Sequence, residues 1–173
     1  MKSELESIKT WYEYNSYVRK KYLKAIFENL KEEDRYKDRG ASFPSIVDIF
    51  VHTVDAYRYW FRYIYPDRYE DYKKLRGTER FTLQRLQEEE YKIDSYVLSF
   101  IRSLKEEDLD RTLAIDGKKL GWRASKISLR QMLLHLIEEE LQHRGELNAL
   151  FWQLDIGPPI TDLFDWTTET KGG

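Results

Sequence analysis

Apolar residues recur at helical spacing in four long segments of the chain, and mainly polar residues separate these segments. Within each segment the apolar side chains repeat every three or four residues, which gathers them on one face of an α-helix. We therefore expect helices near residues 4–30, 45–64, 82–103 and 128–154. Pro66 follows the second segment closely, in agreement with a helix that ends there.

Two of these helices begin with residues that cap a helix N-terminus. Ser45 precedes the second helix, with Asp48 three residues later. Ser128 precedes the fourth, with Gln131 in the same relation. A serine followed three residues on by an acidic or amide side chain is the capping-box pattern, in which each residue bonds the backbone N–H of the other.

The connections differ in character. The stretch "KEEDRYKDRGASFP" after the first helix is expected to be a charged loop, and Asp116 and Gly117 lie between two short alternating stretches that predict a hairpin or an irregular loop. The tail "ITDLFDW" is apolar enough to pack back on the helices. The expected fold is all-α: one domain over residues 1–173, an antiparallel four-helix bundle with a short insertion between its third and fourth helices.

Composition and charge exclude several function classes. The chain has 173 residues, 41% of them hydrophobic, and its 29 basic and 31 acidic residues leave a net charge of −2. Such a balance gives no electrostatic reason to expect nucleic-acid or membrane binding. No cysteine is present, which excludes thiolate ligands and disulfides. Without a signal-like or membrane-length apolar run, we expect a cytoplasmic protein.

The fourth helix interrupts its own apolar stripe with polar residues. At about 100° per residue, His143 falls near the middle of that stripe, Glu139 roughly 45° from its centre and His135 at about 85°. A carboxylate in a core is costly unless it is paired or bound to a metal. The stripe itself consists of Leu129, Met132, Leu136, Leu147, Leu150 and Leu154.

The spacing of these polar residues favours one set of metal ligands. Glu139 and His143 are four residues apart, so their Cβ atoms lie about 5–6 Å from each other and can share one ion. His135 and His143 are separated by about 12 Å along the axis, which is too far. His52, on the flank of the second helix beside the small Ala56, can face a neighbouring helix. Three ligands from two helices would leave open positions on a metal, as catalytic sites do.

Each of these residues also has a structural interpretation. The Glu139–His143 pair can be a hydrogen-bonded structural pair, or part of a salt bridge with Arg144 or Arg58. A histidine such as His135 is more often structural than a ligand. Asn15, on the apolar face of the first helix with Ile8, Trp11, Tyr22 and Ile26, is expected to be a hydrogen-bonded core amide or to line a pocket.

Several stretches together resemble the DinB-like (damage-inducible) family of four-helix bundles, over nearly the whole chain. The segment "NSYVRKKYLKAIFENLKEED", with Asn15, is similar to that family's first helix, and "DRGASFPSIVDIFVHTVDAYRYW" to its second helix with a ligand histidine, here His52. The segment "LLHLIEEELQHRGEL" resembles its fourth-helix signature, in which histidines at positions 139 and 143 complete a site. The ending "QLDIGPPITDLFDW" is similar too.

The resemblance implies a divalent metal held by three histidines, commonly nickel or zinc, and frequent dimers. Relatives transfer or isomerise small molecules with thiols such as bacillithiol or mycothiol. This chain departs from the pattern at two positions. Glu139 replaces the middle histidine, and Gln142 stands directly before His143, where relatives often have a histidine. Either Glu139 is a ligand in a two-histidine, one-carboxylate set, which suits iron, manganese or zinc, or the site is degenerate and Glu139 bonds to His52 or His143.

The leading functional hypothesis is therefore an enzyme of this class that depends on a divalent metal (Ni, Zn, Fe or Mn). His52, Glu139 and His143 would hold the metal, and Arg144 would steady an anionic group or pair with Glu139. The reaction would be a transfer or isomerisation of an unknown small molecule, with a thiol as one option for the co-substrate. The alternative is a non-enzymatic, stress-related or binding bundle with a degenerate site. A homodimer is expected, since the chain is rich in Tyr, Trp and Phe, which interfaces favour.

Overall fold

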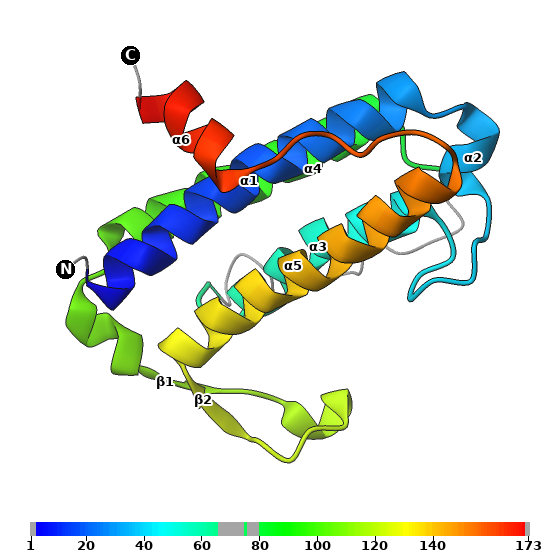
Figure 1. Ribbon diagram of the computed structural model, residues 1–173. Coiled ribbons are helices and arrows are strands. Elements are labelled where there is room, and N and C mark those ends of the chain that lie inside the picture. The colour runs from blue at the N-terminus through cyan, green and yellow to red at the C-terminus, as the bar shows by residue number, and fades with distance from the viewer. Residues whose placement is uncertain (1–2, 66–74, 76–79, 172–173) are drawn as a thin grey trace.

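The computed structural model describes residues 3–65, 75 and 80–171, and its main body is a bundle of long helices (Figure 1). These are α1 (Glu4–Asn29), α3 (Ile46–Phe61), α4 (Leu83–Ser103) and α5 (Leu129–Gln153). The predicted all-α bundle is confirmed, with helix ends within three residues of the expected ones. In Figure 1, α1 and α5 run in one direction and α3 and α4 in the other, so α1 with α4 and α3 with α5 are antiparallel pairs.

The core lies between these four helices and is unusually aromatic. Tyr12, Phe50, Tyr57, Phe61 and Phe151 are among its largest fully buried side chains. Of the stripe predicted on α1, all but Trp11 are buried. Among the described residues the buried amide nitrogen of Asn15 has no hydrogen-bond partner, so the expectation of a hydrogen-bonded amide is wrong for that atom.

Both predicted caps are present. The Ser45 hydroxyl oxygen accepts a hydrogen bond from the backbone N–H of Asp48 at 3.1 Å. Ser128 and Gln131 form the full reciprocal box, because the N–H of Gln131 donates to the Ser128 hydroxyl at 3.1 Å and the N–H of Ser128 donates to the Gln131 side chain at 2.8 Å. These bonds satisfy backbone donors that the first helical turn leaves free, and they set where α3 and α5 begin.

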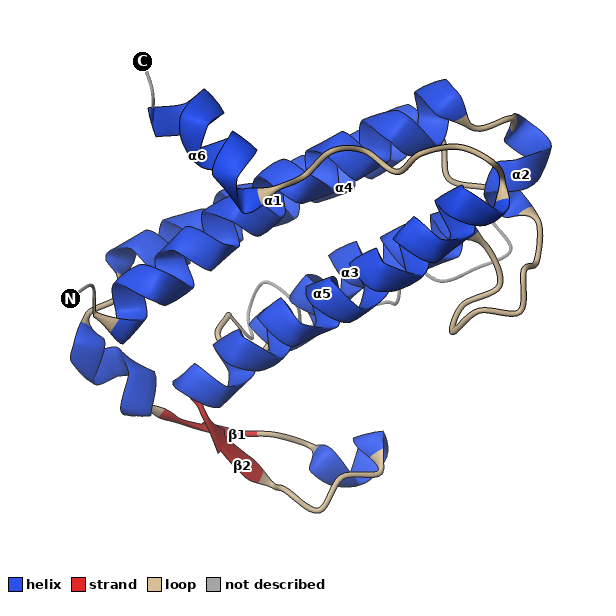
Figure 2. Cartoon of the chain, viewed as in Figure 1, coloured by secondary structure: helices blue, strands red, loops and turns tan. Residues whose placement is uncertain are grey.

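The charged connection after α1 is not only a loop. It contains a short helix, α2 (Glu32–Tyr36), shown with the other elements in Figure 2. Arg35 donates hydrogen bonds to the carbonyl of Leu30 at 3.0 Å and to that of Phe27 at 2.7 Å, which fastens α2 to the end of α1. The prediction of a plain loop is wrong because one helical turn is too short to show a repeating apolar period.

The insertion before α5 is a β-hairpin with a long connection. Strands β1 (Thr112–Ala114) and β2 (Lys126–Ser128) pair antiparallel. The predicted Asp116–Gly117 pair does not form a two-residue turn; it opens a 3-10 turn, Gly117–Leu120. A Cβ at Gly117 would lie 1.7 Å from the carbonyl oxygen of Ala124, so only glycine fits there.

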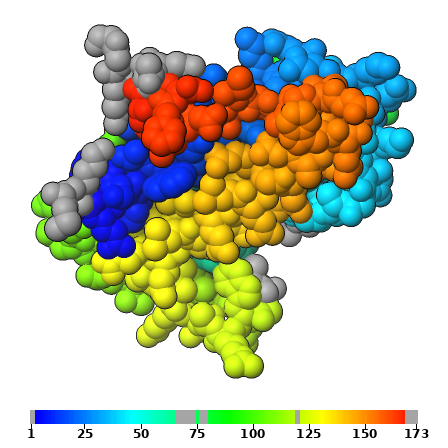
Figure 3. All heavy atoms as spheres, in the orientation of Figure 1, coloured from blue at the N-terminus to red at the C-terminus, as the bar shows by residue number. Residues whose placement is uncertain are grey.

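The chain after α5 returns along the bundle, as the tail composition predicts. Figures 1 and 3 show this segment lying over the outside of the bundle before α6 (Leu163–Lys171). Trp166 of α6 is buried and meets the ring of Tyr14 edge-on, with ring centroids 5.6 Å apart. The Tyr14 hydroxyl also donates a hydrogen bond to the carbonyl of Thr161. These contacts hold the tail against α1.

A buried cluster of charges joins α1, α4 and α5, and nothing in the sequence reading anticipated it. The Arg19 guanidinium donates hydrogen bonds to the carboxylates of Asp94 and Glu140. The nearer oxygen of Glu90 lies 3.7 Å from its Nε. All four side chains are buried. On α1, the buried Arg19 therefore faces three carboxylates of two other helices, and the exposed Lys20 adds a second cation 2.8 Å from Asp94.

Glu90 makes the stability of this cluster depend on pH. Burial raises its pKa from 4.5 to about 7, Asp94 adds to the rise, and Arg19 and Lys20 oppose it. Because the folded protein holds this proton more tightly than the unfolded chain, the stabilising effect is present below about pH 4.5 and is lost as pH rises through about 7. The pKa of Glu140 is also raised, mainly by burial, and acts in the same direction.

We predict that Glu90→Gln removes much of this pH dependence. The neutral amide should leave the protein little changed at pH 5 and should stabilise it at pH 8 by roughly 1–3 kcal/mol relative to the wild type. Urea unfolding followed by circular dichroism at both pH values measures the difference. Glu88→Gln, an exposed carboxylate on the same helix, is the control and should show no such change. A Glu90→Gln protein less stable than the wild type at pH 8 would contradict this account.

Candidate metal centre

The packing of α3 against α5 brings the three residues predicted as metal ligands together. The Oε2 atom of Glu139 lies 3.2 Å from Nε2 of His52 and 3.4 Å from Nε2 of His143. Each residue offers one ligand atom, and the three atoms lie within 4.8 Å of one another. The two imidazole rings are nearly perpendicular, with centroids 4.7 Å apart. Two side chains one helical turn apart on α5 and one side chain on α3 thus direct their ligand atoms toward the same point.

This cluster is closed on one side and open on the other. The side chain of His143 is only 5% exposed, whereas those of His52 and Glu139 are 22% and 24% exposed. Glu139 is therefore half-buried, which corrects the expectation that it lies in the core. The open side lets solvent or a small molecule reach the carboxylate, and the closed side fixes His143.

The fully buried carboxylate of α5 is Glu140, the residue after the predicted one. A helix in a bundle packs against two neighbouring helices. The part of its circumference that is buried is therefore wider than the face that contacts either neighbour alone. Glu140 faces α1, where it accepts a hydrogen bond from Arg19, while Glu139 and His143 face α3. The helical wheel predicted which side of α5 is buried, but it could not predict which neighbouring helix each buried residue contacts.

Glu146 and Ser42 support His143 from behind, and the sequence reading missed both. Nδ1 of His143 lies 2.7 Å from a carboxylate oxygen of Glu146, and the Ser42 hydroxyl donates to the same oxygen at 2.7 Å. A second carboxylate on the outer nitrogen is the usual partner of a metal-binding histidine, because it turns the other nitrogen toward the ion. The signal available in the sequence was the spacing of Glu146, three residues after His143.

Phe43 covers the two histidines. Its ring stacks on His52 with centroids 4.1 Å apart and an angle of 24°, and it meets His143 edge-on at 5.6 Å. Phe43 lies in the segment before α3 that the sequence predicts to be a charged loop. This ring keeps water from that side of the imidazoles and leaves the Glu139 side as the more open approach.

The charges of the cluster are strongly coupled. Hydrogen bonds from His143 and then His52 hold the pKa of Glu139 well below its usual value, against the opposing effect of burial. Burial lowers the pKa of His143, but its hydrogen bonds to Glu139 and Glu146 outweigh burial and raise that pKa overall. Glu139 is thus an anion at neutral pH. Two imidazoles and a carboxylate of this kind match the donor sets that hold zinc, iron or manganese.

The remaining candidates lie elsewhere. His135 is not in the three-residue cluster, although its Nε2 is 3.5 Å from the other oxygen of Glu139. Arg144 donates to the Tyr14 hydroxyl at 3.1 Å, and Arg58 pairs with Asp55 at 2.8 Å. In the part of the chain that the structure describes, the salt bridges considered between Glu139 and Arg144 or Arg58 are therefore replaced by other contacts.

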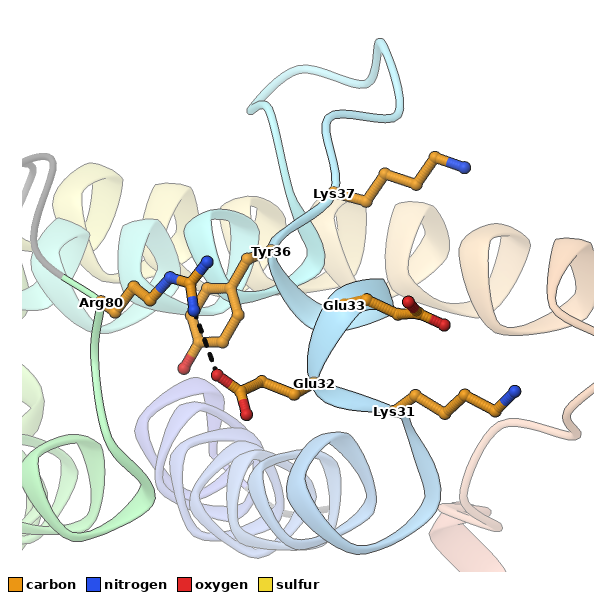
Figure 4. Close-up of a pocket in the computed structure, with 6 residues that line it drawn as sticks. All are labelled: Lys31, Glu32, Glu33, Tyr36, Lys37 and Arg80. Atoms are coloured by element: carbon orange, nitrogen blue, oxygen red, sulfur yellow. Dashed lines mark hydrogen bonds and ion pairs between the residues drawn. The ribbon is translucent and has the colours of Figure 1, made fainter.

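A separate pocket of about 760 Å³ lies beside α2 (Figure 4). Arg80 pairs with Glu32 at 3.1 Å and covers the Tyr36 ring, while Lys31, Glu33 and Lys37 point away from them. The pocket is lined by side chains of both charges, and Arg80 and Glu32 already pair with each other. The lining therefore indicates no ligand class. Among the described residues no helix is both long and apolar enough to span a membrane.

Comparison with known proteins agrees with the resemblance drawn from the sequence. No curated protein matches the chain. The sequence model of the DinB family, however, matches residues 1–172, which is essentially the entire sequence. With this match over the entire sequence and an all-α bundle, the chain belongs to the DinB family.

Proposed function

We propose that this protein is a divalent-metal-dependent enzyme, with His52, Glu139 and His143 as the metal ligands. The observation that carries the proposal is the convergence of three ligand atoms within 4.8 Å on the half-open side of a bundle. The support of His143 by Glu146 adds to it, because such an outer carboxylate orients a ligand nitrogen. A bound divalent ion would act as a Lewis acid or lower the pKa of a bound water or thiol.

Residues around the three ligands would position them and shape the approach to the metal. Glu146 and Ser42 fix the orientation of His143, and Phe43 fixes that of His52. Glu139 supplies a negative charge that a three-histidine site lacks, so it lowers the net charge of the metal site by one. Substrate would approach from the side where Glu139 is exposed, since the Phe43 side is covered.

The reaction we propose is a transfer or isomerisation of a small molecule, as the family resemblance implies. The alternative is a bundle in which the same three residues form only a hydrogen-bonded network. That alternative has its own support, because His52 and His143 already form hydrogen bonds with Glu139. Measurement of bound metal separates the two.

We predict that protein purified without chelator carries close to one divalent metal ion per chain. Elemental analysis by plasma mass spectrometry measures it, and His52→Ala should abolish it because one of three ligands is lost. Glu138→Ala is the control and should retain metal, since Glu138 is an exposed carboxylate of α5 outside the cluster. Wild-type protein that is empty as purified and takes up neither zinc, nickel, iron nor manganese in equilibrium dialysis would refute the proposed function.

A further inference from the structure

We propose that His135 is a positioning residue for Glu139, one that restricts this carboxylate to a single metal-binding oxygen. The inference rests on the proposed function. The two oxygens of Glu139 face different partners: Oε2 lies 3.2 Å and 3.4 Å from the ligand nitrogens of His52 and His143, whereas Oε1 lies 3.5 Å from Nε2 of His135. One oxygen is thus directed to the ligand cluster and the other away from it.

Two tryptophans hold the His135 ring in this orientation. Trp60 of α3 meets it edge-on with centroids 5.1 Å apart, and Trp122 meets it edge-on at 5.7 Å. The two indoles stack on each other at 5.3 Å with an angle of 16°. Trp122 lies in the connection between β1 and β2, so the insertion that precedes α5 reaches the neighbourhood of the metal centre through this ring. The outer nitrogen of His135, Nδ1, lies 3.5 Å from Glu138.

A histidine in this place acts on the carboxylate rather than on the metal. The separation of 3.5 Å is slightly longer than an ordinary hydrogen bond, so a movement of a few tenths of an ångström lets Nε2–H donate to Oε1. A donor on Oε1 would hold that oxygen away from a bound ion and leave Oε2 as the oxygen that faces the ligand cluster. Such a site would keep room for water or substrate beside the ion, as catalytic metal sites do.

Variants of His135 test this role through metal binding alone. His135→Phe keeps an aromatic ring against the indoles but removes the donor, and His135→Gln keeps an N–H donor. We expect His135→Phe to weaken Co(II) binding by about 10–100-fold, the range found for partners of metal ligands. We also expect it to alter the visible absorption spectrum of the Co(II) complex, which reports coordination. His135→Gln should restore affinity and spectrum toward the wild type.

Two further variants complete the test, one as a control and one that acts on the His135 ring indirectly. Glu138→Gln changes the exposed carboxylate at the outer nitrogen and should leave Co(II) affinity and spectrum unchanged. Trp122→Leu loosens the ring without touching Glu139, and it should weaken Co(II) binding less than His135→Phe does. Trp122 is 41% exposed, so this variant is expected to fold, and it decides the question should His135→Phe not fold.

The outcomes separate the two proposals. If wild-type protein binds Co(II) stoichiometrically and both His135→Phe and Trp122→Leu bind it with wild-type affinity and spectrum, the positioning role is wrong and the metal site stands. If the wild type binds neither Co(II) nor zinc, nickel, iron or manganese, the proposed function fails and the role of His135 fails with it. Weaker binding that His135→Gln does not restore would also overturn the role of the N–H donor.

Discussion

Replacing Arg19 with methionine is expected to lower the free energy of unfolding by about 3–5 kcal/mol, the range for removing one partner of a buried ion pair. Methionine fills similar space but leaves Glu140 without the cation that now donates a hydrogen bond to it, and leaves Asp94 with only the exposed Lys20, 2.8 Å away. Glu90, 3.7 Å from the guanidinium, loses its counter-charge as well. Burying unpaired carboxylates carries a large penalty, and the loss should be largest above neutral pH, where all three are most fully ionised.

The matched control is Arg102→Met on the surface. Arg102 pairs with Glu13 at 3.2 Å and is 64% exposed, so its removal should change stability by less than about 1 kcal/mol. Urea unfolding of both variants at pH 8 gives the comparison. A double variant, Arg19→Met with Glu140→Gln, should recover part of the loss by removing one of the unpaired charges. Equal effects of Arg19→Met and Arg102→Met would show that the buried cluster contributes little.

That cluster also shows where sequence reasoning stops. The repeating apolar period of each long helix was visible, and so were its capping residues, because both are local properties of the chain. Arg19 is a polar residue within one such helix, and its partners lie 71 to 121 positions away. Periodicity within a single helix does not say which neighbour a residue meets. The prediction that Glu139 is a core carboxylate of α5 failed for the same reason, because the buried one is Glu140.

The candidate metal centre was predictable in part. The i, i+4 spacing placed Glu139 and His143 on one face, and the flank position of His52 on the second helix, together with the family resemblance, added the third ligand. Their convergence then follows from two helices that pack side by side. Phe43 and Ser42 were missed because they lie in a connection that has no periodic pattern, where only the folded structure shows what each side chain covers. The short helix α2 in the same connection was missed likewise.

Glu139 is the proposed ligand at which this chain departs from the family pattern. Glu139→Ala is expected to weaken divalent-metal binding by more than about 100-fold. Loss of a residue that only hydrogen-bonds a ligand weakens binding by about 10–100-fold, and this variant removes a ligand itself. The helices should stay intact, because the Glu139 side chain is 24% exposed and alanine has a higher helix propensity than glutamate. Equilibrium dialysis with zinc measures the affinity, and circular dichroism checks the fold. Unchanged metal content in this variant would mean that Glu139 is not a ligand.

Glu139→His carries the test further, because it restores the histidine that the family resemblance places at this position. Three imidazoles from α3 and α5 would then face the same point, and imidazole suits nickel and zinc. We therefore expect this variant to retain stoichiometric metal and to shift its preference away from manganese, which favours carboxylate ligands, toward nickel or zinc. Competition dialysis with equal concentrations of manganese, zinc and nickel measures the shift against the wild type. If Glu139→His binds metal while the wild type binds none, the natural carboxylate has disabled the site, and the hydrogen-bonded network between Glu139, His52 and His143 is its purpose in this chain.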